Sequence, residues 1–224
     1  MKQYLRAVLN ITRKDLAVEW RSRELVSAML IFALLTIFIF NFALELDVEA
    51  RGSVTAGVLW VTFAFSGSLG LNRALAVEKD RGCLDGLLLA PVDHTCIYFG
   101  KLLSTLALML LVAAIVLPLY SLFYTVNLLR PGLALVIMLG TLGYSAVGVL
   151  LATMSVQTRT RDILLPILLF PVVLPVMIAA VRASSGLLSA LPFSDIRPYI
   201  DLLLAYDAIF LAVGLMTFNY IVEE

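Results

Sequence analysis

Six long apolar runs, joined by short polar connections, follow one another along the chain. Each run has 19 to 24 residues, and about 20 mostly apolar residues cross the hydrocarbon core of a bilayer as a helix. Because lipid offers no hydrogen-bond partner to backbone groups, a spanning segment of this length must be helical. The pattern therefore predicts an all-α integral membrane protein, folded as one transmembrane domain over residues 1–224. The predicted spans are 25–44, 54–77, 102–124, 133–156, 163–181 and 202–222.

The segment before the first span, residues 1–24, has the pattern of a basic amphipathic helix that lies in the membrane interface. At about 100° per residue, one sector of this helix is polar and basic, and the apolar side chains lie mostly opposite. Asp15 and Glu19 interrupt the apolar side. The alternative is a positively charged flank with no further role. The polar sector holds Gln3, Arg6, Asn10, Arg13, Lys14 and Arg21, and the apolar side holds Leu5, Val8, Leu9, Leu16 and Trp20.

Composition and charge support the membrane prediction and orient the spans. Hydrophobic residues make up 62% of the chain, against about 45–50% in soluble domains. Twelve Lys and Arg lie on the side of the two termini and four on the other, which predicts that both termini are cytoplasmic. The net charge of zero gives no indication of nucleic-acid binding. We expect no removable signal peptide.

The largest cytoplasmic connection, residues 78–101, is unusually polar for this chain. Asp80 can cap a short helix over 81–89, which Pro91 would end. Asp93 is a suitable N-cap for a second helix that leads into the third span. The first helix would expose one apolar stripe on the cytoplasmic surface, which favours docking on a partner. Its members are Leu84, Leu87 and Leu88.

This connection does not have the residues of a nucleotide-binding loop. Gly100–Lys101 would need a glycine at position 95 and a Ser or Thr at 102 for a phosphate-binding loop, but Thr95 and Leu102 stand there. We therefore expect a non-catalytic chain, with any ATP hydrolysed by a separate subunit.

Three soft ligands lie in the same connection, Cys83, His94 and Cys96. Structural zinc sites use four ligands at closer spacing, and haem ligation by His94 is a further alternative. We expect instead reduced thiols, a polar first-turn histidine, no metal and no cofactor bound by this chain.

Two spans carry residues that can serve function within the membrane. The fifth has Pro166, Pro171 and Pro175, which can make a gate or be ordinary membrane-helix prolines. The last has Asp207, a carboxylate that can line a polar path, contact a neighbouring subunit or simply be hydrated near the surface. In the fourth span, Gly140, Gly143 and Gly148, with Ser145 and Ala152, predict a surface for close helix packing.

The segment "EKDRGCLDGLLLAPVDHTCIYFGKLL" resembles the cytoplasmic loop of type-2 ABC transporter permeases. In that family the loop is the coupling helix that docks on the ATPase, and Cys83 stands where Thr or Ser is more usual. The matching positions are Glu78, Arg81, Gly82, Cys83, Leu84, Asp85, Leu87, Leu88, Pro91, Ile97, Gly100 and Lys101.

The resemblance narrows to the CcmB family, the membrane subunits of cytochrome c maturation haem exporters. It is carried by "RKDLAVEWRSRE", "GVLWVTFAFSGSLGLNRAL" and "DILLPILLFPVVLPVMIAA", in that order along the chain. It implies a permease of the bacterial cytoplasmic (inner) membrane that couples ATP hydrolysis by a partner to haem delivery or to release of a haem-loaded periplasmic chaperone. The alternative is a type-2 exporter of another substrate.

The resemblance also implies partners: a CcmA-like ATPase, a CcmC-like haem-handling membrane subunit, a CcmD-like one-span subunit, a CcmE-like haem chaperone and a second copy of this chain. A secondary carrier would show internal repeats and midplane charge pairs, and an intramembrane enzyme would show paired His and carboxylates within its spans. Neither pattern is present in the sequence.

Overall fold

The computed structural model describes residues 2–43, 48–80, 86, 93–124, 128, 130–156, 158 and 160–223. Within these residues the regular secondary structure is entirely helical, which confirms the predicted all-α fold. The helices are α1 (Lys2–Ser22), α2 (Glu24–Ala43), α3 (Val48–Asp80), α5 (His94–Tyr124), α6 (Pro131–Val156), α7 (Arg161–Leu188) and α8 (Phe193–Glu223).

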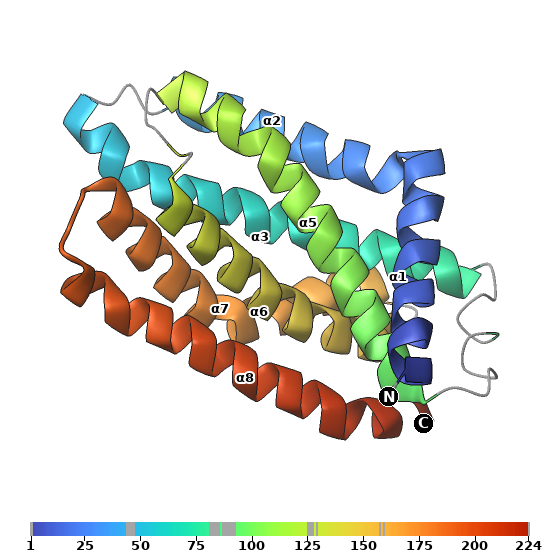
Figure 1. The fold of residues 1–224 in the computed structure, drawn as a ribbon. Coiled ribbons are helices and arrows are strands. Elements are labelled where there is room, and N and C mark those ends of the chain that lie inside the picture. The colour runs from blue at the N-terminus through green and yellow to red at the C-terminus, as the bar shows by residue number, and fades with distance from the viewer. Residues whose placement is uncertain are drawn as a thin grey trace.

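Six of these helices, all except α1, are long and apolar enough to cross a membrane, as predicted. Figure 1 shows them running side by side, while α1 lies across the N-terminal part of α5. The N and C labels lie at the same end of the bundle, as an even number of spans requires. The direction in which the bundle crosses the membrane stays a prediction.

Most helices extend beyond the apolar runs that revealed them. α3 continues to Asp80, α7 to Leu188, and α8 begins at Phe193, nine residues before the apolar run 202–222. Hydropathy marks the part of a helix that matches the lipid, whereas backbone hydrogen bonding continues through polar residues that are compatible with a helix.

The fourth span, α6, packs against four other spans, α3, α5, α7 and α8. Its glycines allow this, as predicted: the α3 residues Trp60 and Leu71 fill the space in which side chains at Gly140 and Gly148 would lie. Small residues let helix backbones approach closely where lipid tails give no hydrophobic driving force between helices.

Three polar side chains in the core make hydrogen bonds between helices. The Trp60 indole N–H donates to Ser184 Oγ at 2.9 Å. The hydroxyls of Tyr144 and Tyr98 donate to the carbonyls of Ala64 and Ala146, at 2.6 and 3.1 Å. Such bonds satisfy groups that lipid cannot, and they connect α7 to α3, α6 to α3 and α5 to α6.

Candidate coupling site at the start of α5

Most of the predicted coupling helix lies outside the described residues. This applies to Arg81, Gly82, Leu84, Asp85, Leu87, Leu88 and Pro91, so the docking stripe stays a prediction. Glu78 lies in the last turns of α3, and Gly86 has helical backbone and is exposed. The structure describes the two anchors of the connection, the end of α3 at Asp80 and the start of α5 at Asp93.

The second anchor begins with the predicted N-cap. Asp93 Oδ1 accepts hydrogen bonds from the Thr95 backbone N–H at 2.9 Å and from Thr95 Oγ1 at 2.8 Å. These two bonds favour the carboxylate and lower the pKa of Asp93 below its ordinary value. The cap fixes where the connection ends and α5 begins, which confirms the prediction for this residue.

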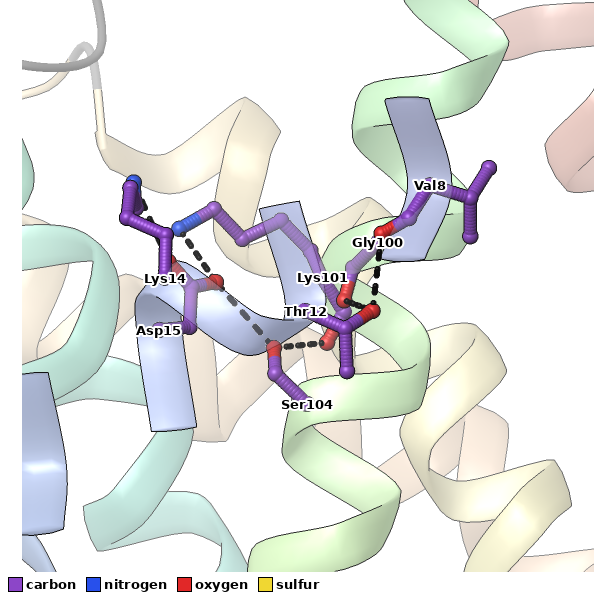
Figure 2. A network of polar contacts seen from close by, with 7 residues as sticks. All are labelled: Val8, Thr12, Lys14, Asp15, Gly100, Lys101 and Ser104. Carbon is purple, nitrogen blue, oxygen red and sulfur yellow. Dashed lines mark hydrogen bonds and ion pairs between the residues drawn. The ribbon is translucent and has the colours of Figure 1, made fainter. Parts of the chain in front are cut away.

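A polar interface binds α1 to the first turns of α5 (Figure 2). Lys101 Nζ lies 2.9 Å from Asp15 Oδ2, and Ser104 Oγ donates to the same carboxylate oxygen at 3.1 Å. Thr12 Oγ1 donates to the carbonyl of Gly100 at 3.2 Å. The Lys101 side chain is 9% exposed and that of Asp15 is 13% exposed, so this is a buried ion pair with an additional donor.

Gly100 makes this crossing close. A Cβ atom at this position would lie 2.6 Å from Ile11 Cγ2, far inside van der Waals contact. Gly100–Lys101 is thus the place where α1 crosses α5, and Lys101 is held by a carboxylate of its own chain. This geometry agrees with the conclusion from the sequence that Gly100–Lys101 is not part of a phosphate-binding loop.

The structure gives α1 three faces rather than two. The first packs on α5 and α2 and carries Val8, Ile11 and Asp15. The second is apolar and uncovered, with Leu5 54% and Trp20 75% exposed. The third is the predicted basic sector, where Arg6, Arg13 and Arg21 are exposed. The sequence pattern placed Val8 on one apolar side with Leu5 and Trp20 and treated Asp15 and Glu19 as interruptions, whereas the structure divides that side into a packed face and an uncovered face.

Glu19 connects the other end of α1 to the first span. Its Oε1 accepts a hydrogen bond from the Val26 backbone N–H at 2.8 Å, in the first turn of α2. Between the helices, Arg23 takes a left-handed φ of 55° and donates its N–H to the Glu19 carbonyl at 2.7 Å. α1 is therefore bound at one end to α2 and along its length to α5.

The soft ligands of the connection do not meet in the described residues. Cys96 is buried, with Sγ 4.0 Å from the Tyr4 carbonyl oxygen, and Cys83 lies outside the described residues. Among the residues that the structure describes, no three His, Cys, Asp or Glu side chains are grouped for a metal ion.

The structure does not bring the fifth-span prolines and Asp207 together on one surface. α7 is a single helix through Pro166, Pro171 and Pro175, and the last two are exposed on its outer side. Asp207 is 4% exposed and faces Gly143 of α6, inside the bundle. In this conformation the carboxyl is covered by the chain's own helices.

Comparisons with known proteins agree with the resemblance seen in the motifs. The profile of the CcmB protein family matches residues 6–223. "Heme exporter protein B" of Rhodobacter capsulatus is 27% identical over 200 residues, 85% of this chain and 88% of the relative. Its namesake in Haemophilus influenzae is 29% identical over 179 residues, 77% and 78% of the two chains. The one in Bradyrhizobium diazoefficiens is 24% identical over 214 residues, 93% of each. Because the family match covers nearly the whole length, this chain belongs to the CcmB protein family.

Proposed function

We propose that this chain is the permease subunit of a haem-exporter ABC complex in cytochrome c maturation. The relatives that carry the name "Heme exporter protein B" align over most of the chain, and six helices can span a membrane. The chain itself is not an enzyme. A CcmA-like subunit hydrolyses ATP, and the permease transmits the resulting motion to haem delivery or to release of a haem-loaded CcmE-like chaperone.

The observation that carries the ATP-coupling part is the position of the coupling motif. It connects two core helices, α3 and α5, so a force applied to it reaches the membrane bundle directly. On its C-terminal side the connection ends at the Asp93 cap, and eight residues later Lys101 is held by Asp15 of α1. The loop is thus attached to a firmly packed helix rather than to a free tail.

The remaining parts of the proposal are a CcmC-like membrane subunit, a CcmD-like one-span subunit, a second copy of this chain and a location in the bacterial inner membrane. Haem and ATP are handled by the partners. The alternative is a type-2 exporter of another substrate. It would use the same coupling loop, and it differs from the proposal only in the substrate whose transport ATP hydrolysis drives.

Deletion and complementation in the source bacterium separate these two functions. The proposal predicts that deletion abolishes covalent haem attachment to c-type cytochromes and that the wild-type chain restores it. It also predicts that an ATPase subunit with a phosphate-binding loop remains bound after gentle detergent extraction. Normal c-type cytochromes in the deletion strain would refute the haem function, and purification without any ATPase would refute the coupling function.

A further inference from the structure

Among the acidic residues whose side chains the structure describes on the six spans, Asp207 alone is buried. It follows Phe193, the first residue of α8, by 14 positions, which is about 21 Å along the axis at 1.5 Å per residue. Its side chain is buried, and among the described residues neither Oδ1 nor Oδ2 has a hydrogen-bond partner. Buried polar groups nearly always have partners, so this exception needs an explanation.

On the side of Gly143, the atoms that lie next to the carboxyl include no donor. A Cβ atom at Gly143 of α6 would lie 2.5 Å from Oδ1 and 3.2 Å from Val176 Cγ2 of α7, so the carboxyl rests against a glycine backbone beside an apolar side chain. The neighbouring Tyr206 hydroxyl is already used, since it donates to the Val172 carbonyl at 2.9 Å.

No described cation on the packed helices faces this position. α8 packs against α6, α7 and α5, and α6 has no charged residue at all from 131 to 156. On α7, Arg182 is exposed and lies about 9 Å further along the helix than Val176. On α5, Lys101 is bound to Asp15, and the Tyr98 hydroxyl donates to Ala146. The remaining charged groups of α7 and α8 with described side chains are exposed: Asp195, Arg197 and Asp201.

A carboxylate without a cation is unfavourable in this position. The free-energy cost of removing a full charge from water far exceeds the cost of removing a neutral acid. A metal ion would need several oxygen ligands, and among the described residues no His, Cys, Asp or Glu group is placed to hold one. A bound water would need two to four polar partners, and among the described residues the carboxyl has no polar partner of its own. A proton needs only the carboxyl itself. We propose that Asp207 is an intramembrane proton-binding site, occupied while α8 packs against Gly143.

The proposal has a mechanical consequence for the bundle. The proton stays bound only while the glycine surface of α6 and the neighbouring α7 side chain keep the carboxyl dry. Separation of α8 from α6 would admit water and release the proton, so the protonation state of Asp207 reports this helix contact. The proposed proton site rests neither on the role of the coupling loop nor on the identity of any transported molecule.

Infrared spectroscopy of the full chain in lipid nanodiscs tests the site. Aspartate carrying ¹³C in its side-chain carboxyl shifts the C=O stretching band of a protonated acid and thereby identifies it. We expect such a band at neutral pH in the wild type, its loss in Asp207→Asn and its retention in the exposed-residue control Asp201→Asn. Absence of the band in the wild type, or its persistence in Asp207→Asn, would overturn the proposal.

A second variant keeps the test decisive if Asp207→Asn fails to insert. Gly143→Ala places a methyl group against the carboxyl and must move the Asp207 side chain or α8, so we expect the band to weaken or shift. Gly57→Ala, which meets no atom within 4 Å, should leave the band unchanged. An identical band in wild type and Gly143→Ala would show that the protonated acid is not at this contact.

Discussion

The Asp15–Lys101 pair holds α1 on α5, and removal of one partner should release the helix. Asp15→Leu removes the carboxylate that lies 2.9 Å from the Lys101 ammonium, and with it one of the two acceptors near the Ser104 hydroxyl. Breaking a buried ion pair in this way costs about 3–5 kcal/mol. Because the Lys101 and Asp15 side chains keep 9% and 13% exposure at the bundle end, we take about 3 kcal/mol, the lower bound. At about 1.4 kcal/mol per tenfold change, the undocked population of α1 rises roughly a hundredfold.

Thiol labelling measures that population. Val8 is 5% exposed in the interface, so Val8→Cys, in a background with Cys83→Ser and Cys96→Ala, reacts only when α1 undocks. We expect Asp15→Leu to raise the labelling rate about a hundredfold by the same estimate. Lys14→Ala is the matched control, because Lys14 contacts the same carboxylate at 3.0 Å but is 41% exposed. Exposed pairs contribute about 1 kcal/mol or less, so we expect at most about a fivefold change.

The double variant Asp15→Leu with Lys101→Met separates charge burial from loss of shape. Replacing both members of a buried pair by apolar groups is often near neutral, so labelling should return to within about tenfold of the parent. A parent-like rate in Asp15→Leu, or a double variant that labels faster than the single one, would refute the assignment of Lys101 to a buried ion pair.

Two further predictions test the packing and the cap. Gly140→Ala drives a methyl group into Trp60 and should destabilise the bundle by about 1–3 kcal/mol. Thermal unfolding in detergent measures this loss, with Gly57→Ala as the control that should unfold like the wild type. Equal stabilities of the two variants would contradict the packing of Trp60 against Gly140. Asp93→Ala should cost about 1 kcal/mol and Asp93→Asn less. Since the pKa of Asp93 is lowered in the folded chain, its ionised form stabilises above the unfolded-state pKa, and the advantage over Asn should vanish as pH falls through the lowered value; a pH-independent difference would contradict this.

The architecture was readable from the sequence because lipid imposes it. Runs of about 20 apolar residues leave the helix as the one available structure, and the small residues at Gly140 and Gly148 mark where helices meet. The Asp93 cap was also readable, since capping depends on residues within three positions.

What sequence reasoning missed depends on contacts between distant residues. Asp15 lies on the apolar side of α1 because it binds Ser104 of α5, which is 89 residues away in the sequence. A helical projection of α1 contains no information about a second helix. The two acids on the apolar side were the available signal of a third face. For Asp207, the sequence located a carboxyl within a span but could not show that it points at Gly143.

Recovery of the ATPase subunit with variants of residue 88 decides whether the loop couples ATP hydrolysis to the bundle. Leu88→Asp places a charge on the predicted docking stripe, and truncating or charging an anchor of an interface costs about 2 kcal/mol or more, or at least a tenfold loss of binding. The matched control is Leu191→Asp. Leu191 is 50% exposed in the connection between α7 and α8. This connection follows the C-terminal end of α7, one helix length away from the start of α7 at Arg161.

With insertion of all chains verified, we predict that pull-down of the ATPase falls tenfold or more with Leu88→Asp and stays at the wild-type level with Leu191→Asp. Equal recovery and equal ATP turnover with the wild-type and Leu88→Asp chains would contradict the role of this loop as the ATPase-docking element.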